Sequence, residues 1–91
     1  MTQSCHITWY PPLTSVTGTE STLDFDAPMP VRDFLDRLLT DFPDLGKFTH
    51  VERDTGAVVG LMVLRGDTLL MPNDIVEPGG KLDVLSAIDG G

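Results

Sequence analysis

One amphipathic segment constrains the fold of this 91-residue chain more than any other feature. Between Pro30 and Pro43, apolar residues recur at i, i+3, i+4, i+7, i+8 and i+11, which is the spacing of a single helix face. These residues are Val31, Phe34, Leu35, Leu38, Leu39 and Phe42. Pro30 suits the first position of a helix, because its missing N–H would have no partner there, and Pro43 ends the helix. The remaining segments must supply the surface against which this face packs.

Patterns typical of strands occupy much of the remaining chain. β-Branched and aromatic residues, or apolar and polar residues in alternation, predict strands. The segment 57–64 is nearly all apolar, so we expect a strand buried on both faces. Loops are expected at 13–18 and 44–47, and turns at 54–56, 65–67 and 78–80. The predicted strands are 5–10, ended by Pro11-Pro12, then 21–26, a short one within 49–53, 57–64 and 81–85.

The order of these elements predicts an α+β domain in two layers. The first two strands should form a hairpin, and the helix then crosses to the later strands. This crossover should place the first and last strands side by side and parallel at the centre of the sheet, as in a β-grasp fold. We therefore predict a mixed sheet of four to five strands packed on one main helix. Residues 1–85 form this domain in our interpretation, and residues 86–91 form a flexible C-terminal tail.

The charge balance limits the classes of partner. Fourteen acidic residues against six basic ones give a formal net charge of −8. Nucleic acids and anionic membrane surfaces are disfavoured, because both require clustered basic residues. The longest apolar run is too short to span a bilayer, and the N-terminus lacks the basic flank and apolar run of a signal peptide. The single Cys5 allows no internal disulfide. These features predict a soluble cytoplasmic protein.

Familiar catalytic devices are absent from the sequence. It contains neither a phosphate-binding P-loop nor a glycine-rich dinucleotide motif. His6 and His50 lie far apart, without a carboxylate or cysteine at metal-ligand spacing, so no metal site is predicted. Cys5 is expected to be a small buried apolar residue and not a nucleophile. Carboxylate pairs such as Asp24 and Asp26 are expected on solvated faces. No catalytic residue and no bound cofactor are predicted.

The C-terminal residues carry the functional signal. Gly90 and Gly91 follow the last predicted strand after only a few residues. Without side chains, such a tail can enter a narrow channel and bring its carboxylate to the catalytic groups of another protein. A carboxylate becomes reactive once it is adenylated, because AMP is a good leaving group. The chain has no ATP-binding loop, so a partner would have to activate it. We interpret the chain as a carrier and not as an enzyme.

Several motifs resemble the MoaD/ThiS family of small sulfur-carrier proteins, which are relatives of ubiquitin. The resemblance runs over most of the chain. Segment 7–13, followed by Thr17-Gly18, resembles the first strand and Pro-Leu corner of the family. Segment 30–38 is similar to its helix motif T-V-R-D-L-L-x-x-L, and 63–66 to its V-N-G turn. The remaining matches are 79–85 with the final strand, 69–74 with a variable loop, and Gly90-Gly91 with the reactive end.

This resemblance implies a specific role for the tail. An E1-like ATP-dependent enzyme would adenylate Gly91, and sulfur would then be installed as a thiocarboxylate. The sulfur donor would be a protein such as a cysteine desulfurase or rhodanese, and a downstream enzyme would accept the sulfur. Gly90 and Asp89 belong to the tail. The residues that fall where family members present apolar contacts to a partner are Ile88, Leu85, Val84 and Leu82, although core packing explains Leu82 and Val84 equally well.

The tail departs from the family pattern in ways that leave alternatives open. Ser86-Ala87 and Asp89 stand where family members commonly carry two prolines and a small residue, and Gly80 replaces the usual aspartate of the turn. The extra negative charge should alter partner choice, which indicates a dedicated carrier of a specialised pathway. One alternative is a protein modifier that is attached to lysines through Gly91. Another is a β-grasp interaction module with an inert tail. The sequence names neither the sulfur acceptor nor the oligomeric state.

Overall fold

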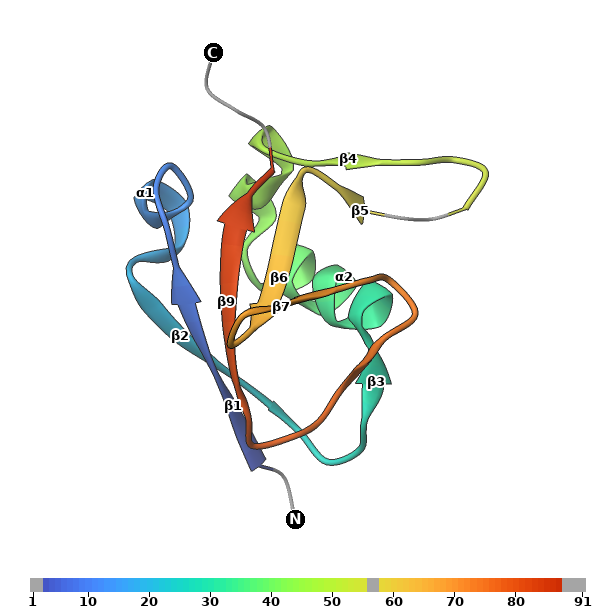
Figure 1. Cartoon of the computed structure of the whole chain (residues 1–91). Coiled ribbons are helices and arrows are strands. Elements are labelled where there is room, and N and C mark those ends of the chain that lie inside the picture. The colour runs from blue at the N-terminus through green and yellow to red at the C-terminus, as the bar shows by residue number, and fades with distance from the viewer. Residues whose placement is uncertain (1–2, 56–57, 88–91) are drawn as a thin grey trace.

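A mixed five-stranded sheet forms the centre of the computed structural model, which describes residues 3–55 and 58–87. The strands lie in the order β2-β1-β9-β6-β7 (Figure 1). Two short two-stranded sheets, β3-β8 and β4-β5, lie outside it. The elements are β1 (Gln3–Trp9), α1 (Thr14–Thr17), β2 (Glu20–Phe25), β3 (Met29–Pro30), α2 (Val31–Asp41), η1 (Pro43–Lys47), β4 (His50–Val51), β5 (Val58–Val59), β6 (Leu61–Arg65), β7 (Thr68–Leu70), β8 (Ile75–Val76) and β9 (Lys81–Ser86).

The central strand pairing is the one that the order of elements predicts. β1 and β2 form an antiparallel hairpin, in which Cys5 faces Leu23 and Ile7 faces Ser21. β1 pairs in parallel with β9, and Ile7 lies beside Leu82. β9 in turn pairs antiparallel with β6. The first and last strands are therefore neighbours at the centre of the sheet, which confirms the predicted β-grasp topology.

Helix α2 covers one face of the sheet with its apolar stripe. Val31, Phe34, Leu35 and Leu38 are buried, while Leu39 and Phe42 are partly buried against the same core. Pro30 stands one position earlier than predicted: it is the N-cap, with φ −63° and ψ 151°, and it also pairs with Ile75 in the small β3-β8 sheet. The first two N–H groups of α2 are bonded from outside the helix. Val31 N–H donates to the carbonyl of Asp74 at 2.8 Å, and Arg32 N–H donates to that of Pro72 at 3.1 Å.

Two segments predicted as loops contain short helices. Residues 14–17 form α1, because Leu13 is fully buried and the Thr17 hydroxyl donates to its carbonyl at 3.1 Å. Gly18, at φ 79°, ends this turn. Residues 43–47 form the 3₁₀ helix η1, which starts with Pro43 and anchors the fully buried Leu45. In both cases the burial of one leucine holds a short helical turn, and a single apolar residue is too weak a pattern to predict a helix.

The sequence predicts one strand buried on both faces over the apolar run 57–64, and the structure differs from this prediction. Its described part is divided at Gly60 into β5 and β6. Gly60 has φ 112°, and a Cβ there would collide with the carbonyl oxygen of Phe48. Leu61 and Val63 are buried, but Met62 and Leu64 between them are only partly covered. The prediction fails because α2 covers only one face of the sheet, so an all-apolar strand leaves half of its side chains on the other face.

Candidate functional site

Helix α2 lies on one face of the five-stranded sheet, and no other element of the described chain covers the opposite face (Figure 1). We call it the open face. Side chains of neighbouring residues in a strand alternate between the two faces. Because Leu82 and Val84 of β9 are buried towards α2, Lys81, Asp83 and Leu85 belong to the open face. The register extends this assignment to the neighbouring strands. The open face also carries His6 and Thr8 from β1, Glu20 and Thr22 from β2, Met62 and Leu64 from β6, and Leu69 from β7.

The structure separates the predicted partner contacts on β9 into two groups. Leu82 is 4% exposed and Val84 is fully buried, and both belong to the hydrophobic core. Core packing therefore accounts for these two residues, and their role as partner contacts stays a prediction. Leu85 is partly exposed and lies on the open face opposite Met62. The period-two alternation within 82–85 already separates Leu85 from the other two in the sequence.

Leu85 is part of a continuous apolar area. It pairs with Met62 in the register of β9 and β6, and Leu64 pairs with Leu69 across β6 and β7. Leu69 is 47% exposed, and the other three are partly exposed. Apolar side chains that share one sheet face without a covering element are typical of protein contact surfaces. We call these four residues the apolar area.

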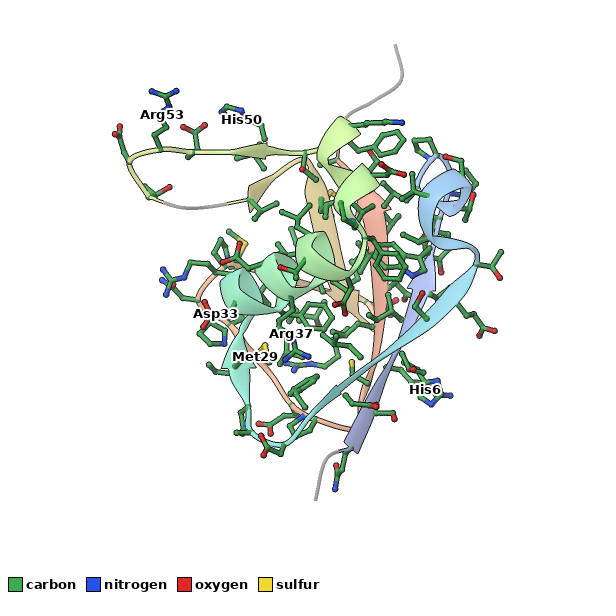
Figure 2. The ribbon with its side chains drawn as sticks, turned by 180° about the vertical axis from the view of Figure 1, so that it is seen from behind. His6, Met29, Asp33, Arg37, His50 and Arg53 are labelled. Carbon is green, nitrogen blue, oxygen red and sulfur yellow. The ribbon has the colours of Figure 1, made fainter. Side chains whose placement is uncertain are left out.

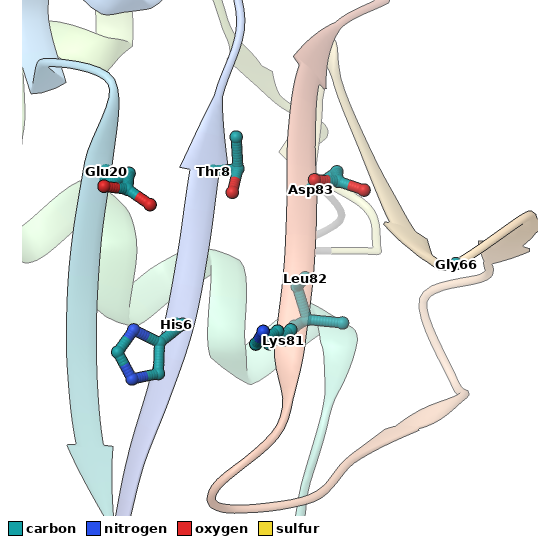
Figure 3. Close-up of a pocket in the computed structure, with 7 residues that line it drawn as sticks. All are labelled: His6, Thr8, Glu20, Gly66, Lys81, Leu82 and Asp83. Carbon is teal, nitrogen blue, oxygen red and sulfur yellow. The ribbon is translucent and has the colours of Figure 1, made fainter.

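A hollow of about 530 Å³ adjoins this area and has a different character. It is lined by His6, Thr8, Glu20, Gly66, Lys81, Leu82 and Asp83 (Figure 3). In the strand register, Thr8 lies between Glu20 on β2 and Asp83 on β9, while His6 lies beside Lys81. Among the described residues, none of these charged groups forms an ion pair with another. The open face thus combines an apolar area with a polar, solvated one.

Tyr10 and Asp83 form a polar pair on the open side of the sheet. The Tyr10 hydroxyl donates to Oδ1 of Asp83 at 3.2 Å. The negative charge of Asp83 raises the pKa of Tyr10, with smaller contributions from burial and from this hydrogen bond. The phenol is therefore held in its neutral form. Sequence analysis did not single out either residue, because they are 73 positions apart and only the parallel pairing of β1 with β9 brings them together.

The remaining candidate groups show no catalytic arrangement. Cys5 is fully buried, and burial raises the pKa of its thiol, so the neutral form is favoured. His6 lies exposed on β1, and His50 stands on β4, on the other side of the molecule (Figure 2). His50 has a carboxylate nearby, that of Glu52 at 3.7 Å. Within residues 3–55 and 58–87, no group of three or more histidine, cysteine, aspartate or glutamate side chains is placed to hold a metal ion.

The root of the predicted tail is held at the centre of the sheet. β9 continues to Ser86, one residue past the predicted domain boundary, and the N–H of Ala87 donates to the carbonyl of Gly60 at 2.8 Å. Gly60 is the residue that divides β5 from β6. The predicted tail residues Ile88, Asp89, Gly90 and Gly91 lie outside the described residues.

Comparison with known proteins identifies the architecture. No family model and no curated protein sequence matches the chain. Among solved structures, one of SAMP1 from Haloferax volcanii is 26% identical, covers 97% of this chain and 99% of its own, and has a TM-score of 0.72. A second structure, of small archaeal modifier protein 1 from the same organism, is 21% identical, covers 94% and 99%, and has a TM-score of 0.74. The chain has the ubiquitin-like β-grasp fold of SAMP1.

The SAMP1-like architecture confirms two predictions. The first is the fold class, a mixed sheet of five strands with one main helix. The second is the resemblance to the MoaD/ThiS family of ubiquitin-like proteins, which now rests on structure as well as on motifs. In addition, none of the helices in the described part of the chain is long and apolar enough to cross a membrane.

Proposed function

We propose that this chain is a ubiquitin-like carrier that presents the carboxylate of Gly91 to an activating enzyme, and that its main task is sulfur transfer. One combination of observations supports the proposal. The chain matches SAMP1 over almost its full length, and its sequence ends in Gly90-Gly91, four residues beyond Ala87, the residue bonded to Gly60.

The chemistry requires a partner at each step. The Gly91 carboxylate oxygen attacks the α-phosphorus of ATP in the activating enzyme, and pyrophosphate leaves. The terminal sulfur of the donor's persulfide then attacks the carbonyl carbon of the adenylate, and AMP leaves with the C–O bond electrons. A thiol then cleaves the S–S bond of the resulting acyl disulfide: it forms a disulfide with the donor's sulfur, and the bond electrons stay on the sulfur at Gly91 as a thiocarboxylate. An E1-like enzyme supplies the ATP site, a cysteine desulfurase or rhodanese supplies the sulfur, and a downstream enzyme takes it. The chain contributes a slim, uncharged approach to the carboxylate through Gly90 and Gly91.

The apolar area on the open face is the surface that we assign to the activating enzyme. Leu85 lies on the strand that ends at Ser86, so a partner that covers Leu85 and Met62 lies beside the point where the predicted tail begins. Burial of apolar side chains drives such contacts, and charged neighbours direct the approach. Asp83, two residues before Leu85, provides such a charge on the same face.

The intact mass of the protein tests the proposal. The full chain is incubated with ATP, a sulfur donor and the E1-like enzyme of its own organism. We expect the mass gain of one oxygen-to-sulfur exchange, and no gain in a variant without Gly91. A Leu85→Asp variant should slow the reaction at limiting protein concentration, whereas Val59→Asp, which changes an exposed valine outside the open face, should not. An unchanged mass with active enzyme, or a gain that survives removal of Gly91, contradicts the proposal.

A second function, protein modification, is favoured by the name of the relative, a small archaeal modifier protein. In that case the amine of a target lysine attacks the activated Gly91 and displaces AMP, which forms an isopeptide bond. The same incubation in cell extract separates the two roles. Adducts on target lysines that contain Gly91 favour the modifier, while a thiocarboxylate that is consumed with a small molecule favours the sulfur carrier. If removal of Gly90 and Gly91 leaves the biological function intact, the chain is an interaction module.

A further inference from the structure

The outer edge of β2 has backbone groups without partners. β2 stands at one end of the strand order (Figure 1). In an antiparallel pair, opposite residues alternate between pairs whose N–H and C=O groups bond to each other and pairs whose groups point away. His6 N–H donates to Gly80 at 2.8 Å, on the β9 side, so His6 and its partner Thr22 form a pair of the second kind. The N–H and C=O of Thr22 therefore point outward.

The same alternation assigns the neighbours of Thr22. Glu20 and Asp24, two positions away on either side, also turn their backbone groups outward. For Asp24 a side-chain contact confirms the outward direction, because the guanidinium of Arg37 on α2 donates to its carbonyl oxygen at 3.2 Å. The other outward groups, both from Glu20, both from Thr22 and the N–H of Asp24, have no bond to the described chain. They form an open template for one more strand.

The side chains along this edge determine what can pair with it. Glu20, Thr22 and Asp24 are all exposed and lie on the open face. If a second copy paired antiparallel about Thr22, Glu20 of each copy would face Asp24 of the other. Like charges directly opposite each other in a sheet are destabilising. The edge is therefore protected against self-pairing, and its charge pattern is complementary to a strand with basic residues at two alternate positions.

We propose that the edge of β2 binds an extended basic segment of a partner protein by strand addition. The segment lies antiparallel to β2, with a small or β-branched residue opposite Thr22 and a lysine or arginine two positions away on each side. Main-chain bonds to Glu20, to Thr22 and to the N–H of Asp24 provide the attachment, since the carbonyl of Asp24 already accepts from Arg37. The two carboxylates select the basic side chains. The carboxylate of Asp24 also accepts a bond from the Ser4 hydroxyl at 2.5 Å and keeps lone pairs for a second donor. This surface is separate from the apolar area, so the inference does not depend on activation of Gly91.

A peptide titration of the ¹⁵N-labelled full chain, followed by NMR, tests the proposal. The probe is acetyl-Lys-Val-Thr-Val-Lys-amide, and the control is a peptide of the same composition with adjacent lysines. We expect the probe to bind at least about threefold more tightly than the control. It should also slow hydrogen exchange at the amides of Glu20, Thr22 and Asp24, but not at those of Ser21 and Leu23, which already face β1. Equal binding of the two peptides, or protection without this alternation, overturns the proposal.

Charge reversal provides a second test. The double variant Glu20→Lys, Asp24→Lys should bind the probe about tenfold more weakly and should prefer acetyl-Glu-Val-Thr-Val-Glu-amide. The matched control, Asp33→Lys with Asp36→Lys, places the same charge change on the exposed face of α2 and should leave binding of the probe within about twofold. If the two double variants lose affinity equally, the attraction is only the net charge of the protein, and the proposed edge site is wrong.

Discussion

Replacement of Gly60 by alanine should destabilise the fold strongly, although it adds a single methyl group. Gly60 has φ 112°, a conformation that residues with a Cβ rarely adopt. Strain of this kind costs about 1–3 kcal/mol. The added Cβ would also lie 3.2 Å from Cα of Thr49 and collide with the carbonyl oxygen of Phe48, which is backbone and cannot rotate away. Overpacking of this kind adds about 1–3 kcal/mol.

We therefore expect the free energy of unfolding to fall by about 2–6 kcal/mol in Gly60→Ala. For a domain of this size, each kcal/mol lowers Tm by about 4–8 °C, so the decrease should exceed about 8 °C. Thermal and urea unfolding followed by circular dichroism measure both quantities. Gly46→Ala is the matched control. Gly46 has neither a positive φ nor any atom within 4 Å of the added Cβ, so its variant should keep its Tm or gain slightly.

The Gly60→Ala variant also tests how the tail root is held. The carbonyl of Gly60 accepts the bond from Ala87 N–H, so a displaced Gly60 should speed hydrogen exchange at the Ala87 amide. If Gly60→Ala and Gly46→Ala melt within about 4 °C of each other, the division between β5 and β6 does not require glycine, and our account of this strand break is wrong.

Three further predictions concern the core, the polar pair and the tail. Leu38→Ala removes a fully buried side chain under α2 and should cost about 2–5 kcal/mol in urea unfolding; an unchanged midpoint would refute the assignment of this helix face. Asp83→Asn should lower the pKa of Tyr10, the only tyrosine, in a near-ultraviolet absorbance titration. Since the folded-state pKa of Tyr10 is raised, its contribution to stability is complete below the unfolded pKa of about 10 and is lost as pH rises through the folded value. Asp83→Asn should therefore lose less stability than the unchanged protein over this pH range. Identical titration curves for the two proteins would contradict the coupling between Tyr10 and Asp83. Removal of Gly90-Gly91 should abolish the mass gain on activation and leave Tm unchanged, because the tail is expected outside the core; a large decrease in Tm would show that it is structural.

The elements best predicted from the sequence are those with long, regular patterns. The stripe from Val31 to Phe42 fixes α2 to within one residue, because six apolar positions agree on one period. The alternation of Leu23 and Phe25 identifies β2 and its buried face. The β-grasp topology then follows from the order of elements, since a helical crossover from a hairpin brings the last strand beside the first.

The features that the sequence did not predict depend on contacts between distant residues. The division at Gly60 arises because the backbone of Phe48 passes close to it, and no local pattern records that approach. α1 and η1 depend on the burial of Leu13 and Leu45, single apolar residues in polar surroundings. On the candidate site, β9 spans Lys81–Ser86, close to the predicted 81–85, and the alternation along this strand buries Leu82 and Val84 while it leaves Leu85 partly exposed.

The parallel pairing of β1 with β9 has a consequence for how the molecule is made. The strands at the centre of the sheet come from opposite ends of the chain, as the 73 positions between Tyr10 and Asp83 illustrate. Contacts at such separation slow folding, because a long loop must close before they form. During synthesis, the core cannot be completed until β9 has left the ribosome. A chain interrupted before β9 lacks the strand that joins β1 to β6, so it cannot form the open face. The complete sheet can therefore form only after translation has passed Ser86.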